Sequence, residues 1–283
     1  MEDEYRILVT GADGQLGSEL RCLLGDRALY VGRSVLDLTD IDAVGAFIRK
    51  HRFAYVVNCA AYTAVDRAEE EKLQCAAANV DIPENLARLA DELDYRIIHV
   101  STDYVFDGRS CVPYTEADRP SPVSVYGATK RKGETALLGL APSSMIIRTG
   151  WLYSSHGRNF VKTILGKLRE GATLRVVCDQ IGTPTYAADL AAFIVRVIDS
   201  HWTGGIFNFS DEGVASWYDF AVAIAEEAGL DGKIIPVTTK EYVTAAARPQ
   251  YSVLDKTKVK ATYGITIPHW RTSLRACMNI LEL

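Results

Sequence analysis

The sequence predicts a doubly wound α/β fold, in which a parallel sheet carries helices on both faces, with a smaller, partly interleaved C-terminal α/β lobe for the substrate. Three observations predict it. Short apolar runs alternate with amphipathic stretches from residue 6 to about 150. The runs are apolar at successive positions, which is typical of strands covered on both faces. A glycine-rich turn joins the first run to the first amphipathic stretch. After Gly150 the pattern loosens into shorter elements, which indicates the second lobe.

Each element follows from its own pattern. The expected strands, all apolar runs, are 6–11, 28–32, 55–62, 96–103 and 143–150. The expected helices, with apolar residues at helical spacing, are 15–25, 41–51, about 65–93 and 124–140. Pro83 must interrupt or restart the third helix, because proline lacks an N–H and its ring crowds the preceding turn. Crossovers between parallel strands are right-handed, so the carboxyl ends of the strands meet at one rim. This rim is expected to hold Gly11, Asn58 to Tyr62, Thr102 and Thr149 to Trp151.

The glycine-rich turn indicates a dinucleotide site. VTGADGQLGSEL places Gly11, Gly14 and Gly17 between a strand and a helix, where backbone N–H groups can approach a pyrophosphate at the helix N-terminus. In this type of fold an acidic residue after the second strand usually marks NAD, but here Arg33 follows that strand. A cation favours a 2′-phosphate, so we expect NADPH or NADH, with NADPH slightly favoured. Arg33 as an ordinary surface arginine is the alternative.

The two lobes are expected to divide the chain unevenly. Residues 1–150, with roughly 175–205, are predicted to form the NAD(P)-binding domain of Rossmann type. Residues 151–174 and 206–283 are predicted to form the substrate lobe.

Composition and charge limit the classes of function. The 283 residues are 48% hydrophobic and carry a formal net charge of −5. No basic block supplies a positive field, so we expect neither nucleic acid nor a membrane as partner. No apolar run approaches the ~20 residues that span a bilayer, and the acidic start MEDEYR is unlike a secretory signal. The six cysteines lack the spacing of a zinc site. We therefore expect reduced thiols, no metal, and a soluble cytoplasmic protein that is a monomer or homodimer.

A tyrosine and a lysine point to the chemistry. SVYGATKRKGETAL sets Tyr126 and Lys130 one turn apart on one helix face. A neighbouring ammonium favours the phenolate and lowers a tyrosine pKa from its ordinary value near ~10, which suits a general acid or base. The spacing alone is common and is usually a solvated helix face. Thr102, at the end of the fourth strand, adds a hydroxyl that can bond a substrate oxygen. With the glycine turn, the three predict a nicotinamide-dependent redox site.

Several phrases resemble one family. The glycine turn, Thr102 and the Tyr126–Lys130 pair resemble the extended short-chain dehydrogenase/reductase superfamily. Six phrases are similar to dTDP-4-dehydrorhamnose reductases: NCAAYTAVDRAE (58–69), STDYVFDG (101–108), YGATKRKGE (126–134), RTGWLY (148–153), DQIGTPTYAADLA (179–191) and RPQYSVLD (248–255). The likeness runs from residue 6 to about 275. It implies that hydride passes from a nicotinamide to the C4 ketone of a dTDP-4-dehydro sugar, giving dTDP-L-rhamnose for a cell-surface polysaccharide or glycoside.

The resemblance also implies roles for individual residues. Tyr126 donates the proton, Lys130 holds the nicotinamide ribose and tunes Tyr126, and Thr102 bonds the reacting oxygen. The implied cofactor contacts are Gly11, Asp13, Gly14, Gln15, Leu16, Gly17, Arg33, Asp37, Leu38, Ala60, Ala61, Tyr62, Tyr126 and Lys130. The implied nucleotide-sugar contacts are Thr63, Thr102, Asp103, Tyr104, Trp151, Asn159, Gln180, Thr183 and Arg248.

Structural roles compete with some of these. Trp151 is also suited to a core, and Asp103 to capping a turn. Thr63, Asp66 and Asn159 stand where helices are expected to begin, so helix capping is the alternative for each.

Other functions remain open. A 4,6-dehydratase is disfavoured, because that family has Thr-Asp-Glu where this chain has Thr102, Asp103 and Tyr104. Another dTDP-4-keto-6-deoxyhexose reductase, or an epimerase, fits the same motifs. A non-catalytic NADP-binding regulatory subunit of a methionine adenosyltransferase keeps similar phrases, although DQIGTPT (179–185) favours the reductase.

Overall fold

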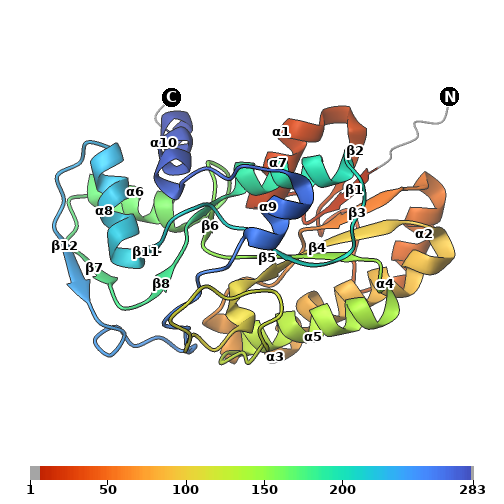
Figure 1. The fold of residues 1–283 in the computed structure, drawn as a ribbon, viewed down its shortest axis with the longest axis horizontal. Helices are drawn as coiled ribbons and strands as arrows, with labels where there is room; N and C mark the ends of the chain where they lie inside the picture. Colours follow the sequence, from red (N-terminus) through yellow and green to blue (C-terminus); the bar gives the residue numbers. More distant parts are fainter. Residues whose placement is uncertain (1–6, 282–283) are drawn as a thin grey trace.

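The computed structural model describes residues 7–281, so the segment MEDEYR, including the expected first strand residue Arg6, lies outside the described residues. A six-stranded parallel sheet forms the centre, in the order β10-β5-β4-β3-β1-β2 (Figure 1). Its strands are β1 (Ile7–Thr10), β2 (Ala28–Val31), β3 (Tyr55–Asn58), β4 (Arg96–Thr102), β5 (Met145–Thr149) and β10 (Gly205–Asn208). The strand order reverses between β1 and β3, where ligands bind in sheets of this kind. The doubly wound fold is confirmed.

Helices cover both faces of this sheet (Figure 1). The first face packs against α1 (Gln15–Leu24), α7 (Ala187–Ile198) and α9 (Thr257–Tyr263). The second packs against α2 (Ile41–His51), α4 (Ile82–Leu93) and α5 (Val125–Leu140). Successive strand residues alternate between the two cores: Ile7 and Val9 lie in the first and Leu8 in the second. This alternation explains why the strands are apolar at every position.

The second lobe has a core of its own, built around Phe220, Trp270 and Leu274. Its helices are α6 (Phe160–Arg169), α8 (Trp217–Glu227) and α10 (Trp270–Leu281). Its strand pairs are β7 (Leu174–Val177) with β12 (Ile234–Val237), β8 (Ile181–Gly182) with β11 (Ala215–Ser216), and β6 (Leu152–Tyr153) with β9 (Thr185–Tyr186). The lobe stands at one end of the large sheet (Figure 1).

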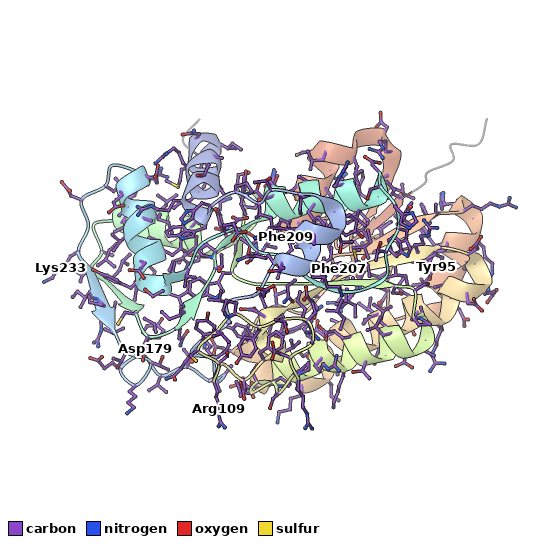
Figure 2. The ribbon with its side chains drawn as sticks, viewed as in Figure 1. Tyr95, Arg109, Asp179, Phe207, Phe209 and Lys233 are labelled. Carbon is purple, nitrogen blue, oxygen red and sulfur yellow. The ribbon has the colours of Figure 1, made fainter. Side chains whose placement is uncertain are left out.

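Several segments pair or pack with the other lobe from the one expected. Strand β7, of which residues 175–177 were expected with the large domain, pairs with β12 in the small lobe, and β8 and β9 pair with strands of that lobe as well. Helix α9, expected in the small lobe, packs on the large sheet. Strand β10, of which residues 206–208 were expected in the small lobe, extends the large sheet beside β5. Phe207 and Phe209 enter the core against α7 and α9 (Figure 2), and burying these two aromatic rings favours that placement. We therefore propose that α7, β10 and α9 join residues 7–149 in the large lobe.

The region between β3 and β4 also differs from the prediction. Strand β3 ends at Asn58, and the chain leaves the sheet instead of continuing to residue 62. Helix begins only at α3 (Lys72–Ala76), which passes through a π-helical turn (Ala77–Asp81) into α4. Pro83 lies in the first turn of α4. The π-helical turn before it changes the hydrogen-bond spacing, so the missing N–H of Pro83 costs little stability there. The predicted restart at Pro83 is confirmed.

Three short 3₁₀ helices complete the described chain, at Gly25–Arg27, Arg67–Glu69 and Asp103–Val105. Among residues 7–281, none of the helices combines the length and the apolar character that crossing a membrane requires.

Candidate active site

The glycine turn stands at the point where the strand order reverses. Gly11 has a φ of +63°, and a Cβ atom there would come within 2.6 Å of the backbone nitrogen of Ala60, after β3. A Cβ at Gly17 would come within 2.6 Å of the Ala12 Cα. The amide of Gly14 donates to the Gly11 carbonyl at 3.0 Å, which closes the turn. Only glycine fits the first and third positions without moving backbone.

The turn leaves a cradle at the start of α1. Gly14 caps the helix and has no side chain with which to satisfy the first N–H groups. The buried Oε1 of Gln15 has no hydrogen-bond partner among residues 7–281. Asp13 lies against Gly32 beside the end of β2, and Leu16 is buried in the first core. Unpaired donors at a helix N-terminus favour an anion, so these residues fit the pyrophosphate of a dinucleotide.

Three further predicted cofactor residues follow β2. Arg33 is exposed just beyond the strand. The carboxylate of Asp37 accepts from the amide and the hydroxyl of Thr39 at 3.0 and 2.7 Å, and these bonds lower its pKa. Leu38 is buried in the second core, and the amide of Asn85 donates to its carbonyl at 3.2 Å. The segment is thus a fixed turn at the β2 side of the glycine cradle, with one exposed cation.

The segment after β3 lies on the other side of the cradle. Ala60 contacts the position of Gly11, and Ala61 follows it, both half-buried. The hydroxyl of Tyr62 donates to Glu71 at 2.6 Å, while its amide donates to the side chain of Asn79 at 2.9 Å. Thr63 is exposed.

Asp66 does not cap a helix, which was one of its expected roles. Both of its carboxylate oxygens accept from the guanidinium of Arg248, at 3.0 and 2.7 Å. The amide of Ala246 also donates to Asp66, at 3.1 Å. This bidentate pair links the segment after β3 to a loop 182 residues later in the sequence. It also means that the guanidinium of Arg248, which was expected to bind a diphosphate, is paired with a carboxylate in the free protein.

Helix α5 presents Tyr126 and Lys130 on one face. Ser124 caps the helix by accepting from the amide of Gly127 at 3.2 Å. The Tyr126 ring meets the edge of the Tyr104 ring, with centroids 5.8 Å apart. Burial raises the pKa of Tyr126 to about 12, while a hydrogen bond from Thr102 acts in the opposite direction. The expected lowering by Lys130 is therefore wrong for the free protein: Lys130 is not among the groups that shift the pKa of Tyr126, and the loss of hydration raises it.

Lys130 is 1% exposed and points into the end of the sheet. Its Nζ donates to the carbonyl oxygen of Val100 at 2.7 Å and lies 3.2 Å from Nε2 of His99. Burial lowers the pKa of Lys130 to about 8. A buried lysine with a weakened hold on its proton, one turn from a tyrosine, is suited to proton chemistry.

Thr102 and Asp103 end β4 beside the tyrosine. The Thr102 hydroxyl donates to Asp103 Oδ1 at 3.1 Å and accepts from the amide of Tyr104 at 3.2 Å. Burial raises the pKa of Asp103 to about 6, while the neighbouring hydroxyls of Ser252 and Thr102 act in the opposite direction. Its Oδ2 has no partner among residues 7–281, and a Cβ at Gly150 would come within 2.7 Å of it. The turn-capping alternative leaves this second oxygen unexplained, since a buried polar atom without a partner is costly.

Trp151 has an unusual backbone. Its φ is +50°, a conformation that costs a bulky residue energy and often accompanies function. The ring stacks on Trp217, with centroids 3.5 Å apart and planes 5° from parallel. A Cβ at Gly182 would come within 2.6 Å of it. Trp151 is half-buried, so part of the residue stays exposed to solvent.

The remaining predicted substrate residues bond to separate partners. Asn159 caps α6 by accepting from the Lys162 amide at 3.1 Å, so the alternative role expected for it, helix capping, is the one it has in the free protein. Gln180 donates to the Thr239 hydroxyl at 3.1 Å. Thr183 donates to the carbonyl oxygen of Gly213 at 2.9 Å. These three do not bond to one another or to Arg248 in the free protein.

Two buried side chains beside Lys130 had no predicted role: Asn58, which was expected only to lie at this rim, and His99, which was not singled out. Nδ2 of Asn58 lies 3.0 Å from Nδ1 of His99, and the other ring nitrogen of His99 faces Lys130. Both residues are completely buried. The signal that was available is a histidine within the apolar strand RIIHVST, three residues before Thr102.

Comparisons with known proteins identify the family of the chain. A family model described as the RmlD substrate binding domain matches residues 5–283. The dTDP-4-dehydrorhamnose reductase of Aggregatibacter actinomycetemcomitans is 41% identical over 95% of this chain and 97% of its own length. The dTDP-4-keto-6-deoxy-D-glucose reductase of Streptomyces niveus is 39% identical over 98% of both chains.

A solved structure has the same fold. The dTDP-4-dehydrorhamnose reductase of Bacillus anthracis strain Ames in complex with NADP superimposes with a TM-score of 0.95 at 35% identity, covering 98% of this chain and 99% of that one. From the match over nearly its whole length, the chain belongs to the dTDP-4-dehydrorhamnose reductase family.

Proposed function

We propose that this protein reduces the C4 ketone of dTDP-4-dehydro-L-rhamnose with NADPH and so forms dTDP-L-rhamnose. The observation that carries the proposal is the meeting of the glycine cradle and the Thr102–Tyr126–Lys130 set at the carboxyl ends of the parallel strands. The B. anthracis relative in complex with NADP supports the cofactor.

When bound, the nicotinamide supplies hydride to the ketone carbon. The backbone at Gly11 to Gly17 would hold the pyrophosphate, and Arg33 would meet the 2′-phosphate that distinguishes NADPH. Lys130 would hold the nicotinamide ribose. Its buried position and single carbonyl partner leave little freedom for its ammonium group.

Tyr126 is the acid. A phenol with a pKa near 12 in the free protein is protonated at neutral pH, so it has a proton to give as negative charge develops on the sugar oxygen. Thr102 donates a second hydrogen bond to that oxygen once its hydroxyl turns from Asp103. The two donors stabilise the charge where it forms, which is how such sites lower the barrier.

On the sugar side, the unpaired oxygen Oδ2 of Asp103 would accept from a hydroxyl group, and the exposed part of Trp151 would pack against the sugar ring. Arg248 would reach the diphosphate. Since Asp66 holds this guanidinium in the free protein, the diphosphate must share it with that carboxylate or replace it.

A stoichiometric assay tests the proposal. The protein is incubated with NADPH and dTDP-4-dehydro-L-rhamnose, and NADPH oxidised is compared with sugar product formed. A reductase consumes one NADPH per product. An epimerase regenerates its cofactor, so sugar conversion without NADPH oxidation would contradict the proposal.

The Streptomyces niveus relative suggests a second candidate substrate. dTDP-4-keto-6-deoxy-D-glucose is tested in parallel, because both sugars carry a C4 ketone. Turnover of this sugar alone would keep the reaction and change the substrate. A regulatory subunit would turn over neither sugar and would instead retain a methionine adenosyltransferase in a pull-down at one-to-one stoichiometry.

We also propose that the enzyme works in the cytoplasm as a monomer or homodimer. The free cysteines Cys22, Cys59, Cys75, Cys111, Cys178 and Cys277 support a reducing compartment. Cell fractionation and light scattering test the two statements.

A further inference from the structure

We propose that Asn58 and His99 are positioning residues for Lys130. Together they fix the imidazole in the form that carries its hydrogen on Nε2, so that an N–H group faces the lysine nitrogen. The effect of this contact on turnover rests on the reductase function proposed above, whereas the state of the imidazole does not.

The orientation of Asn58 is set by two donors. The amide of Ala60 donates to its Oδ1 at 3.1 Å, and the hydroxyl of Thr10 donates to the same oxygen at 2.7 Å. A flipped side chain would set an NH₂ group against the backbone N–H of Ala60, which can only donate. The amide nitrogen Nδ2 therefore faces His99.

This orientation determines the tautomer of His99. Asn58 Nδ2, a donor, lies 3.0 Å from Nδ1, so Nδ1 must accept. Burial keeps the pKa of His99 well below its usual value, and the charge of Lys130 acts in the same direction. The ring is thus neutral and has one hydrogen, which must be on Nε2.

The hydrogen on Nε2 points at Lys130. Nε2 and Nζ are 3.2 Å apart, and Nζ also donates to the Val100 carbonyl at 2.7 Å. An ammonium has three donors and no acceptor, whereas a neutral amine has one lone pair. The N–H group of His99 can donate to the lone pair of the neutral amine, whereas it points a hydrogen at the hydrogens of the ammonium. The contact therefore favours the neutral form of Lys130. The network consequently weakens the hold of Lys130 on its proton and stabilises the amine that remains when the proton leaves.

Other titratable groups around Lys130 act in the opposite sense. Glu134, one turn further along α5, favours the ammonium, as do the thiols of Cys59 after β3 and Cys75 on α3. The carboxylate of Glu134 is itself bound by Arg148 and Arg131. Unlike these neighbours, His99 contacts Lys130 through a hydrogen bond that favours the uncharged amine.

Nitrogen NMR tests the tautomer without substrate or cofactor. The five histidines are labelled with ¹⁵N, and His99→Gln identifies the His99 signals. The proposal predicts a protonated Nε2 and an unprotonated Nδ1 at neutral pH. The reverse assignment would overturn it.

Asn58→Asp tests the cause, because it keeps Oδ1 for Ala60 and Thr10 and replaces the donor Nδ2 with a carboxylate oxygen, which accepts and also brings a negative charge. The hydrogen is expected to move to Nδ1, so that Nε2 accepts from the ammonium. The alkaline limb of the kcat/KM profile is then expected to shift upward by about one pH unit. Asn279→Asp, on an exposed position, is the control and is expected to shift neither reading.

Each outcome decides one part of the proposal. A moved hydrogen with an unchanged pH profile would overturn the action on Lys130. His99→Gln removes the imidazole N–H that faces Lys130 without adding charge, so it separates this contact from the charge introduced by Asn58→Asp and also serves if that variant does not fold. Inactivity of the wild type towards both sugars would refute the reductase function and would leave the tautomer result standing.

Discussion

Replacing Glu134 with Gln is expected to destabilise the protein strongly. The side chains of Glu134 and Arg148 are 0% and 1% exposed, and the guanidinium donates to both carboxylate oxygens at 2.9 and 2.8 Å. The pair links α5, which carries Tyr126 and Lys130, to β5. Glutamine keeps the shape but leaves the buried charge of Arg148 uncompensated. Breaking a buried pair in this way costs about 3–5 kcal/mol.

Urea unfolding followed by circular dichroism measures this cost. Glu84→Gln removes one partner of the exposed pair Glu84–Arg88 and is the matched control; its expected effect is within ~1 kcal/mol. The double variant Glu134→Leu with Arg148→Met replaces the pair with apolar side chains. Its loss of stability should be smaller than the sum of the single losses by about 2 kcal/mol or more.

The pH dependence follows from the same pair. Burial raises the pKa of Glu134, but the bonds and charge of Arg148 outweigh it and the net pKa is lowered. The stabilisation is therefore complete above the unfolded pKa near ~4.3 and is lost as the pH falls further, through the folded pKa. A loss below ~1 kcal/mol for Glu134→Gln, or strict additivity in the double variant, would refute this reasoning.

Three further predictions concern single residues. Gly11→Ala should weaken NADPH binding, measured by calorimetry, at least tenfold, because the added Cβ meets the backbone of Ala60. Gly139→Ala is the control: its added Cβ would have no atom within 4 Å, so NADPH should bind normally and the protein should gain about 0.5–1 kcal/mol of stability. Arg33→Ala should lower the affinity for NADPH about tenfold or more and leave NADH unchanged, since one charge-assisted bond is worth about 1.5–3 kcal/mol; equal loss for both cofactors would contradict it. Burial and the charge of Asp189 raise the pKa of Asp211 to about 8. The folded protein therefore holds a proton that the unfolded chain releases near ~3.9. As the pH rises from the unfolded pKa to the folded pKa, the free energy of unfolding should fall by at most ~1.4 kcal/mol per pH unit. Asp211→Asn should flatten that slope in urea titrations across this range; an unchanged slope would exclude Asp211 as its source.

The sequence predicted the large lobe well because its signals are local. An apolar run such as ILVT needs a fully covered strand, and the glycines at 11 and 17 need positions where a Cβ has no room. The small lobe was harder to predict. Strand β10 is four residues long, and 55 residues separate it from the end of its partner β5, so nothing local indicated their pairing.

Long-range contacts explain what the sequence did not predict at the site. The pKa of Tyr126 depends on how deeply the folded chain buries the phenol, and the sequence spacing to Lys130 says nothing of that. Arg248 meets Asp66 across 182 residues of sequence. The contact of Asn58 with His99 arises from the parallel register of β3 and β4, in which the two residues are paired.

The loss of activity in Tyr126→Phe tests the central claim most directly. Phenylalanine keeps the ring against Tyr104 and removes only the hydroxyl group whose proton is proposed to reach the sugar oxygen. General acid catalysis contributes about 10²–10⁴ in rate, so kcat for dTDP-4-dehydro-L-rhamnose with NADPH should fall by that factor while the Kd for NADPH stays within about twofold. A variant that retains full kcat would contradict the assignment of Tyr126 as the proton donor.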